Sequence, residues 1–276
     1  MRIHSFKFNV PLFFGLAIAV SMMTGGGCFF RGETRQMKIL SYNVRHCRGM
    51  DLKLDLERTA ERIRSTGAEY VGLQELDRCT TRVNGLDEPK ELGRLLGMYP
   101  TFAKTIAFCG GEYGVMILSK EQPLRTVTKP LPGAEPRILL LCEFDAFWVG
   151  TTHLSVANAK ERLESVALIR EAISELPGEK PVFLTGDWNA TIDSSVLKGM
   201  QATFQILSET GRQTFHGGKE RDENGNPYEM SRYCIDYVAV DRAHEKDVRV
   251  LSTSVIEDRL TSDHAPLEVE LSLRVK

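Results

Sequence analysis

Short apolar runs alternate with polar segments along most of the chain, and this pattern predicts an α+β fold. Strands are predicted at residues 38–44, 70–74, 101–108, 113–118, 124–131, 137–144, 147–152, 181–186, 234–240, 247–252 and 266–274. Many of these runs follow one another too closely for a helical crossover. Consecutive antiparallel pairing is therefore expected for much of the sheet structure.

A helical period begins after Asp55, which can cap the first turn. The apolar residues Leu56, Ala60 and Ile63 recur at intervals of four and three positions, which places them on one helix face. Gly67 stands where such a helix would stop. The segment therefore predicts an amphipathic helix.

A second helix is predicted where Asn158 and Glu161 have the spacing of a capping box. Its expected apolar face, which would pack on a sheet, consists of Leu163, Val166, Ile169, Ile173 and Leu176, before Pro177-Gly178 ends it. A short helix near 194–200 and a polar loop at 216–231 precede the closing strands. No internal repeat or linker follows residue 31, so residues 38–276 are predicted to form one domain.

The first 27 residues have the layout of a secretory signal peptide. Arg2 and Lys7 precede an apolar run from Phe8 to Met23, and no acidic residue occurs before Glu33. The run is shorter than the roughly 20 apolar residues that a membrane span needs. Cleavage is therefore expected, in place of a permanent membrane helix.

The segment Gly25-Gly26-Gly27-Cys28 resembles the lipobox of bacterial lipoproteins, in which a small residue precedes the lipidated cysteine. The resemblance implies cleavage before Cys28, lipid on Cys28 and a short tether at 28–37. Gly25 stands where the usual pattern has Leu, so a plain signal peptide cut nearby is an alternative. Either alternative predicts export, to the cell envelope on a lipid anchor or to the periplasm or medium.

The charge pattern makes long duplex DNA an unfavoured ligand. The formal net charge is −2, and loss of residues 1–27 would remove two basic residues and no acidic one, giving −4. Basic residues alternate with acidic ones, as in Glu57-Arg58 and Glu61-Arg62, and form no basic stripe. Nucleic acid is therefore a less favoured partner than a small phosphorylated compound.

The cysteines do not have the spacing of a structural zinc site, because none forms a C-x-x-C pair. Cys142 lies in an apolar run and is expected to be a small buried hydrophobic residue. Cys47 and Cys79 each stand four residues beyond a candidate site residue. In an exported protein these two could form a disulfide, which is one alternative for them.

Polar residues stand at the ends of several predicted strands, where a strand fixes the side chain and the next loop leaves room for a ligand. They are Asn43, Glu75, His153, Asp187, Asn189, Asp236, Asp263 and His264. Mg²⁺ is usually held by one or two carboxylates together with water and substrate phosphate, which suits Glu75 with one of the aspartates. Histidines and amides would then face phosphoryl oxygens.

These residues lie in short motifs that together resemble the endonuclease/exonuclease/phosphatase family. The motifs are Ser-Tyr-Asn-Val at 41–44, Leu-Gln-Glu-Leu at 73–76, Thr-His-Leu at 152–154, Gly-Asp-Trp-Asn at 186–189, Ile-Asp-Tyr-Val at 235–238 and Ser-Asp-His-Ala-Pro-Leu at 262–267. Their order and spacing match over nearly all of residues 38–274. The resemblance implies a four-layer α/β sandwich, in which two mainly antiparallel sheets pack between outer helices.

The resemblance also implies a role for each residue. Glu75 would be the principal metal ligand, with Asn43 and Asp263 at the metal. Asn43 and Asn189 would hold phosphate and metal-bound water, Asp187 would orient the attacking water, and Asp236 would steer His264. His153 is the histidine found in relatives that resemble pancreatic-type deoxyribonuclease and neutral sphingomyelinase.

Four further residues have weaker signals. Arg78 and Tyr113 resemble family positions near the phosphate, although an exposed ion pair and a turn at a strand start would also account for them. His46 and His216 lie in loops that could reach the mouth of the site. They are expected to be solvated loop histidines.

The sequence thus predicts a Mg²⁺-dependent phosphoesterase, with Mn²⁺ as a candidate substitute, that hydrolyses a P–O bond by in-line attack of water. A phosphodiester of small or headgroup size is the favoured substrate, and a nuclease is the first alternative. A surface lipoprotein that only binds its partner is the second. The joint presence of Glu75, Asp187 and His264 argues against that second alternative.

Overall fold

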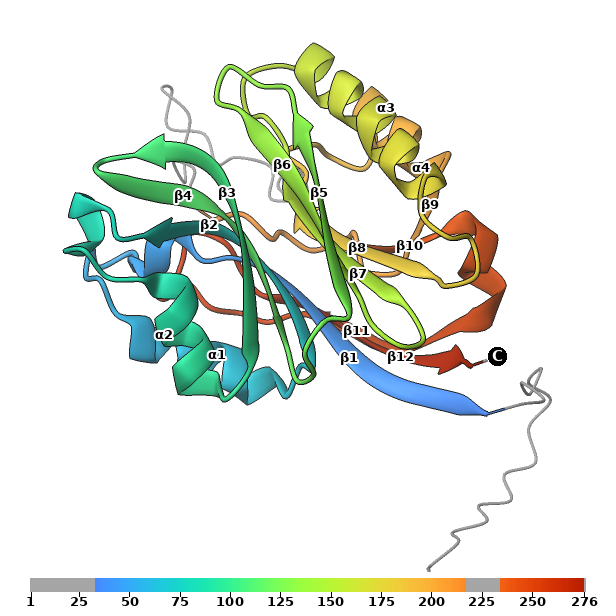
Figure 1. Cartoon of the computed structure of the whole chain (residues 1–276), viewed down its shortest axis with the longest axis horizontal. Coiled ribbons are helices and arrows are strands. Elements are labelled where there is room, and N and C mark those ends of the chain that lie inside the picture. The colour runs from blue at the N-terminus through green and yellow to red at the C-terminus, as the bar shows by residue number, and fades with distance from the viewer. Residues whose placement is uncertain (1–32, 217–233, 276) are drawn as a thin grey trace, which may run out of the picture. The chain divides into compact units, whose positions relative to one another are not determined.

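Two six-stranded sheets pack face to face in the computed structural model, which describes residues 33–216 and 234–275 (Figure 1). The first sheet has the order β11 (Val248–Val255), β12 (Leu267–Arg274), β1 (Thr34–Asn43), β2 (Tyr70–Arg78), β4 (Gly111–Ser119), β3 (Tyr99–Phe108). The second has the order β5 (Arg125–Leu131), β6 (Arg137–Glu143), β7 (Trp148–His153), β8 (Val182–Asp187), β10 (Asp236–Asp241), β9 (Phe204–Ile206). Only β1 with β2 and β7 with β8 pair in parallel among these strands, so the predicted antiparallel character is confirmed.

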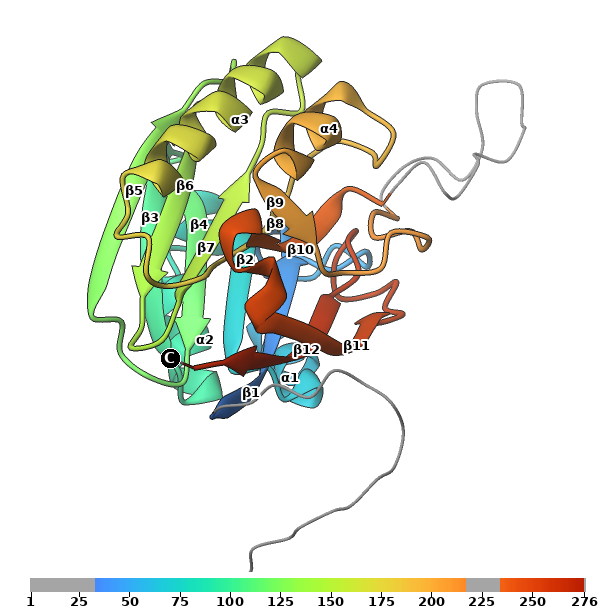
Figure 2. The ribbon, with the colours of Figure 1, turned by 90° about the vertical axis from the view of Figure 1, so that its right-hand side faces the viewer.

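Helices cover the outer faces of both sheets (Figure 2). They are α1 (Leu56–Thr66) and α2 (Glu88–Leu96) on the first sheet, and α3 (Ala159–Ser174) and α4 (Ser195–Gln201) on the second. Short 3₁₀ turns connect some elements: η1 (Arg45–Cys47), η2 (Thr81–Val83) and η4 (Arg242–Asp247). Within the described ranges, none of the helices has the length and apolar character to cross a membrane. The four-layer sandwich is confirmed.

Three apolar clusters fill the spaces between the four layers. The central cluster joins the facing sheets and includes Ile39, Phe183 and Val269. A second cluster lies between the second sheet and its helices, and a third lies under α1 and α2. Cys142 belongs to the central cluster, so the prediction that it is a buried hydrophobic residue is confirmed. Burial of this apolar surface is the main force that holds the layers together.

The predicted capping residues are found at both ends of α1 and at the start of α3. The Asp55 side chain accepts a hydrogen bond from the Arg58 N–H, and Gly67 has a φ of 67°, a left-handed conformation that suits glycine. At α3 the Asn158 side chain accepts from the Glu161 N–H at 3.0 Å. Leu163, predicted on the buried face of α3, is instead 40% exposed.

The structure departs from the sequence prediction at several element boundaries. α2 and β9 were not predicted, since both are short, α2 with nine residues and β9 with three. β1 begins at Thr34, before the predicted start at residue 38, and β2 extends to Arg78. The two strands are therefore longer than their apolar runs.

The suggested disulfide between Cys47 and Cys79 is wrong, because both are free cysteines. Cys47 packs in the buried cluster beneath α1, whereas Cys79 is exposed at the end of β2. The predicted signal peptide, the lipidation at Cys28 and most of the loop at 216–231 lie outside the described residues. Those predictions stay predictions.

Strand register brings the motif residues to one edge of the sandwich. His153 at the end of β7 pairs with Asp187 at the end of β8, and Asp187 in turn pairs with Asp236 at the start of β10. The two sheets approach each other closely at Gly72, beneath this edge. A Cβ added at this position would clash with the side chains of Thr151 and Thr185, so glycine is required there.

Candidate active site

A cavity of ≈ 420 Å³ opens at this edge of the sandwich. It is lined by Glu75, Arg82, Ile106, Phe108, Tyr113, Glu135, Arg137, His153, Val156, Asp187, Asn189, Phe215, Ile235, Asp263 and His264. The structure thus brings seven of the residues singled out in the sequence to one cavity. Asn43 and Asp236 are fully buried directly behind its wall, in hydrogen-bond contact with lining residues.

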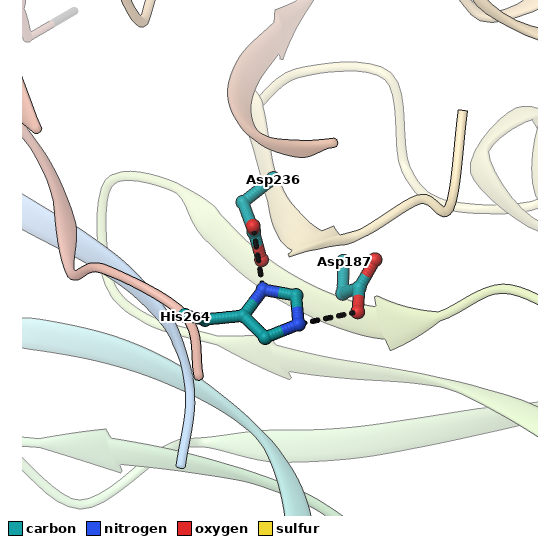
Figure 3. Close-up of side chains that lie close together, drawn as sticks. All are labelled: Asp187, Asp236 and His264. Carbon is teal, nitrogen blue, oxygen red and sulfur yellow. Dashed lines mark hydrogen bonds and ion pairs between the residues drawn. The ribbon is translucent and has the colours of Figure 1, made fainter. Parts of the chain in front are cut away.

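His264 lies between two carboxylates (Figure 3). Its Nδ1 is 2.8 Å from Asp236 Oδ2, and its Nε2 is 3.6 Å from Asp187 Oδ2. The Phe215 ring packs on the imidazole with centroids 4.8 Å apart. Burial alone would lower the pKa of His264, but the carboxylates of Asp236 and Asp187 raise it to about 10. The ring is therefore cationic at neutral pH, and Asp236 fixes its orientation.

Asp187 is the centre of the hydrogen-bond network. Its Oδ1 accepts from the Asn189 N–H at 3.0 Å, and its Oδ2 lies 3.2 Å from Asn43 Nδ2 and 3.4 Å from His153 Nε2. Burial raises the pKa of Asp187, and the nearby Asp236 carboxylate raises it further. The carboxyl group is thus held in place and has an increased affinity for a proton.

His153 has the opposite electrostatic environment to His264. Burial lowers its pKa well below the usual value, and the positive charges of Arg137 and His264 lower it further. Its Nδ1 is buried and has no hydrogen-bond partner within the described ranges. The two histidines of the site therefore differ in charge, His153 being neutral and His264 cationic.

Glu75 reaches the cavity because β2 is irregular at this point. The register with β4 shifts between Leu73 and Leu76, and Glu75 has a φ of 61°. Such a bulge re-aims a side chain, and strained backbone of this kind is common at functional sites. Asn43 Nδ2 donates to Glu75 Oε1 at 3.0 Å, while Asn43 Oδ1 accepts from the Arg45 N–H. Asn43 therefore orients Glu75 and Asp187 through its amide nitrogen.

The donor set at Glu75 fits a divalent cation. Burial raises the pKa of Glu75, and the carboxylate of Asp263 raises it further, so two acidic groups repel each other across the cavity. Both side chains are half-buried and line the cavity. A hard cation held between carboxylates would relieve this repulsion. Arg45 Nε lies 3.5 Å from Asp263 Oδ2, so its positive charge offsets part of this repulsion within the protein.

The buried group of Asp187, Asp236 and His264 is less suited to a metal, although its candidate ligand atoms lie within 4.8 Å of one another. A histidine must be neutral to bind a metal, and the pKa of His264 is raised to about 10. Both of its ring nitrogens also face carboxylates. This group is better described as an oriented imidazolium.

Arg78 and Tyr113 have different positions relative to the cavity. Tyr113 lines it and is 8% exposed. Arg78 does not line it, because its guanidinium pairs with Glu112 and lies 4.9 Å from the Phe102 ring centroid. The ion pair, which was the alternative account of Arg78, is the arrangement observed.

Two arginines that the sequence did not single out reach the cavity. Arg137 begins β6 and is 6% exposed, while Arg82 follows β2 in η2. Arg137 could have been noticed as a basic residue at the start of an apolar strand. Arg82 stands five residues after Asp77, and only its pairing with that buried carboxylate directs it to the site.

The prediction that His46 and His216 are solvated is wrong. Both are half-buried, and buried ring nitrogens of both have no hydrogen-bond partner in the described parts of the chain. Burial lowers the pKa of His46 to about 4. His46 lies in a run of positive φ values, 47°, 42° and 52° for Arg45, His46 and Cys47, directly after Asn43 and Val44. Neither histidine lines the cavity.

Comparison with known proteins identifies relatives of this fold. The model of the endonuclease/exonuclease/phosphatase family matches residues 40–264. A family structure from Beutenbergia cavernae DSM 12333 has a TM-score of 0.72 and 21% identity, covering 87% of this chain and 72% of that one. A mannosyl-6-phosphatase from Bacteroides thetaiotaomicron VPI-5482 has a TM-score of 0.64 and 19% identity, covering 85% and 99%.

D. rerio TDP2, in a complex with single strand DNA product, has a TM-score of 0.63 and 18% identity, covering 86% of this chain and 98% of that one. A sequence search of curated proteins finds no match. At these identities the structural likeness concerns the fold. The phosphatase and the DNA complex show that relatives of one architecture are associated with different ligands.

Proposed function

Because the chain belongs to the endonuclease/exonuclease/phosphatase family, whose members are hydrolases that act on phosphoesters, we propose that it is a Mg²⁺-dependent phosphodiesterase for a small or headgroup-sized substrate. The observation that carries the proposal is the arrangement of one cavity. A cationic histidine, a neutral histidine and an aspartate with a raised pKa lie on its wall together with a separate carboxylate pair.

Glu75 and Asp263 are the residues that would hold Mg²⁺, with Mn²⁺ as a substitute. Family members typically depend on a divalent metal, and the mutual repulsion of these two carboxylates fits that requirement. When bound, the cation would supply Lewis-acid stabilisation of charge on the phosphoryl oxygens. Asn43 would keep Glu75 oriented through the 3.0 Å hydrogen bond from its amide nitrogen.

Asp187 would position the attacking water and accept its proton. The backbone N–H of Asn189 holds Oδ1 of Asp187 and Asn43 Nδ2 holds Oδ2, so the carboxylate has a fixed direction. A raised pKa makes this carboxylate a stronger base than an exposed aspartate. Water would attack phosphorus in line with the leaving oxygen, the P–O bond to that oxygen would break, and the leaving oxygen would take up a proton from solvent to form the alcohol.

His264, His153 and Arg137 would stabilise charge that develops on the phosphoryl oxygens. His264 is cationic and fixed by Asp236, so it offers a charged N–H donor with little reorganisation. Arg137, which lines the same cavity and pairs with Glu135, adds a permanent positive charge. His153 supplies a neutral donor beside Asp187 without adding another charge to the buried site.

The size and lining of the cavity support a small substrate over a long polymer. A volume of ≈ 420 Å³ is within the usual range of small-molecule sites. Polymer binding draws on several phosphate contacts from Lys and Arg, whereas the described residues that line the cavity include two arginines and four carboxylates, namely Glu75, Glu135, Asp187 and Asp263. One scissile phosphate needs fewer cationic groups.

The test is turnover of a panel of lipid, sugar and nucleotide phosphodiesters, phosphomonoesters, and single- and double-stranded DNA, with Mg²⁺, Mn²⁺ or EDTA. We expect hydrolysis of small diesters that EDTA abolishes. A kcat/KM on DNA well above that on every small ester would replace this proposal with a nuclease. Absence of turnover on the whole panel, with phosphate esters still bound, would instead indicate a binding lipoprotein.

A further inference from the structure

Arg82 is anchored by a fully buried carboxylate. Its Nε donates to Asp77 Oδ2 at 2.6 Å and its Nη2 donates to Asp77 Oδ1 at 2.8 Å. Asp77 is 0% exposed, and it also accepts from the Thr80 hydroxyl. The backbone N–H of Asp77 donates to Glu88 at 2.8 Å. A bidentate pair with this support holds the guanidinium in one orientation.

The remaining side of the Arg82 guanidinium is available to a ligand. The guanidinium lies 4.6 Å from the Phe108 ring centroid and 5.6 Å from that of Tyr113, and both aromatic residues line the cavity. Its Nη1 has no hydrogen-bond or ion-pair partner in residues 33–216 and 234–275. The side chain is 33% exposed, so water or a substrate can reach it.

Arg82 and Arg137 occupy different parts of the cavity wall. Arg137 Nη1 pairs with Glu135 Oε1 at 2.6 Å, and its charge is one of those that lower the pKa of His153. Arg82 lies over the rings of Phe108 from β3 and Tyr113 from β4. The two guanidinium groups are therefore held by different carboxylates, Arg82 by Asp77 and Arg137 by Glu135.

We propose that Arg82 forms a subsite for a second oxyanion of the substrate, a phosphate or a carboxylate that is not the group hydrolysed. This rests on the proposed phosphodiesterase function. Phe108 and Ile106 supply apolar surface for the part of the substrate that joins the two anionic groups. Asp77 is the positioning residue, because it acts on the ligand only through Arg82.

The first experiment compares matched phosphodiesters that carry a phosphate, a carboxylate or a neutral hydroxyl at the far end of the leaving group. The wild-type protein should prefer the anionic members. In Arg82→Gln this preference should fall about tenfold or more, mainly through KM, because a hydrogen-bonded charge pair is lost. Arg94→Gln, which removes an exposed arginine on α2, is the matched control and should keep the wild-type preference.

Comparison of the esters that carry a phosphate with those that carry a carboxylate shows which of the two oxyanions the subsite prefers.

Arg82→Lys should lose part of the preference for anionic esters, because lysine cannot keep both hydrogen bonds to Asp77 and also reach the ligand. If Arg82→Gln does not fold, as judged by circular dichroism, Arg82→Lys carries the comparison. An unchanged preference in a folded Arg82 variant would overturn the proposal.

A second experiment does not depend on turnover. Calorimetry in EDTA compares binding of α,ω-alkyl bisphosphonates of several lengths with alkyl monophosphonates. We expect the bisphosphonates of one length range to bind more tightly, and this advantage should disappear in Arg82→Gln but not in Arg94→Gln. If no ester is hydrolysed and the advantage is still observed, the proposed function fails and the subsite stands. Equal binding of both classes by the wild-type protein contradicts the subsite.

Discussion

The charge of each group in the cavity is set by which neighbours it has, and His264 is the clearest case. Two histidines lie against the same Asp187, yet the pKa of His153 is lowered and that of His264 is raised. The difference arises because the carboxylates of Asp236 and Asp187 raise the pKa of His264, whereas burial and the charges of Arg137 and His264 lower that of His153. The roles of the two histidines should therefore separate on mutation.

We expect His264→Ala to lower kcat by on the order of 10²-fold or more, since a preorganised charged donor is removed. Asp236→Asn should have a smaller effect and should lower the pKa of the His264 ring, which NMR titration can follow. His244→Ala is a control, because His244 pairs with Asp241 away from the cavity. Near-normal turnover of His264→Ala would make this histidine structural.

The position of Glu75 leads to a separate prediction about metal binding. Glu75→Ala should weaken Mg²⁺ binding and remove most of the activity while leaving the fold intact, because Glu75 lines the cavity and is not part of the apolar clusters. Glu91→Ala, on the exposed side of α2, is the control. Calorimetric Mg²⁺ titration and circular dichroism measure both properties, and equal Mg²⁺ affinity in the two variants would contradict the assignment.

A third prediction separates the arginines. Arg78 pairs with Glu112 outside the cavity lining, whereas Arg137 is buried within it. Arg78→Gln should therefore change kcat/KM by less than about threefold, since exposed ion pairs contribute little. Arg137→Gln should lower kcat/KM on the best ester by at least tenfold. Steady-state kinetics on one substrate measure both effects. A larger loss of kcat/KM in Arg78→Gln than in Arg137→Gln would restore Arg78 as the phosphate contact.

At the scale of elements, the sequence predicted the site where a side chain ends an apolar strand. Asn43 and Asp187 were visible because each ends a strongly apolar strand, and Glu75 was visible because it follows the apolar run at the start of β2, where a bulge directs it to the cavity. The sequence did not reveal Arg82, because the orientation of its side chain depends on an ion pair with Asp77. No residue spacing in the sequence reveals this tertiary contact. α2 was missed because its nine residues contain only a short helical period.

The N-terminal end of α2 also predicts a pH dependence of stability. Glu88 is 0% exposed, and burial raises its pKa to about 8. The folded state therefore binds a proton that the unfolded state has lost above about pH 4.5, so the contribution of Glu88 to stability is greatest below that pH and falls as the pH rises. The slope from this group is about 1.4 kcal/mol per pH unit and ends above the folded pKa.

Glu88→Gln should remove this slope, because glutamine can still accept the hydrogen bond from Asp77 N–H but cannot ionise. Relative to the wild-type protein, the variant should become more stable with each step from pH 5 to pH 8. Urea denaturation at four pH values measures the difference. Parallel stability curves for the two proteins would show that Glu88 titrates normally in the folded state.

At the scale of the whole molecule, strands of both sheets contribute residues to one cavity. Among the described residues, its lining combines the apolar Ile106, Val156 and Ile235 with both arginines and carboxylates. In the proposed function, such a mixed lining favours a single phosphoester over a polymer, which needs several cationic contacts. Substrate selection would then depend on the leaving group, as the Arg82 subsite requires.

The last prediction concerns where this molecule works. We propose that the chain is exported and anchored by lipid on Cys28, since Gly25-Gly26-Gly27-Cys28 follows a basic start and an apolar run. Mass spectrometry of the mature protein should find an N-terminal, lipid-modified Cys28, because the lipidated cysteine becomes the first residue. Cys28→Ser should shift the protein from the membrane fraction to the soluble fraction while kcat/KM on soluble esters stays the same, because the cavity is formed by residues from Glu75 onward. An unmodified Cys28 with a mature start elsewhere would replace the anchor with simple secretion, and a retained segment 1–27 would contradict cleavage of a signal peptide altogether.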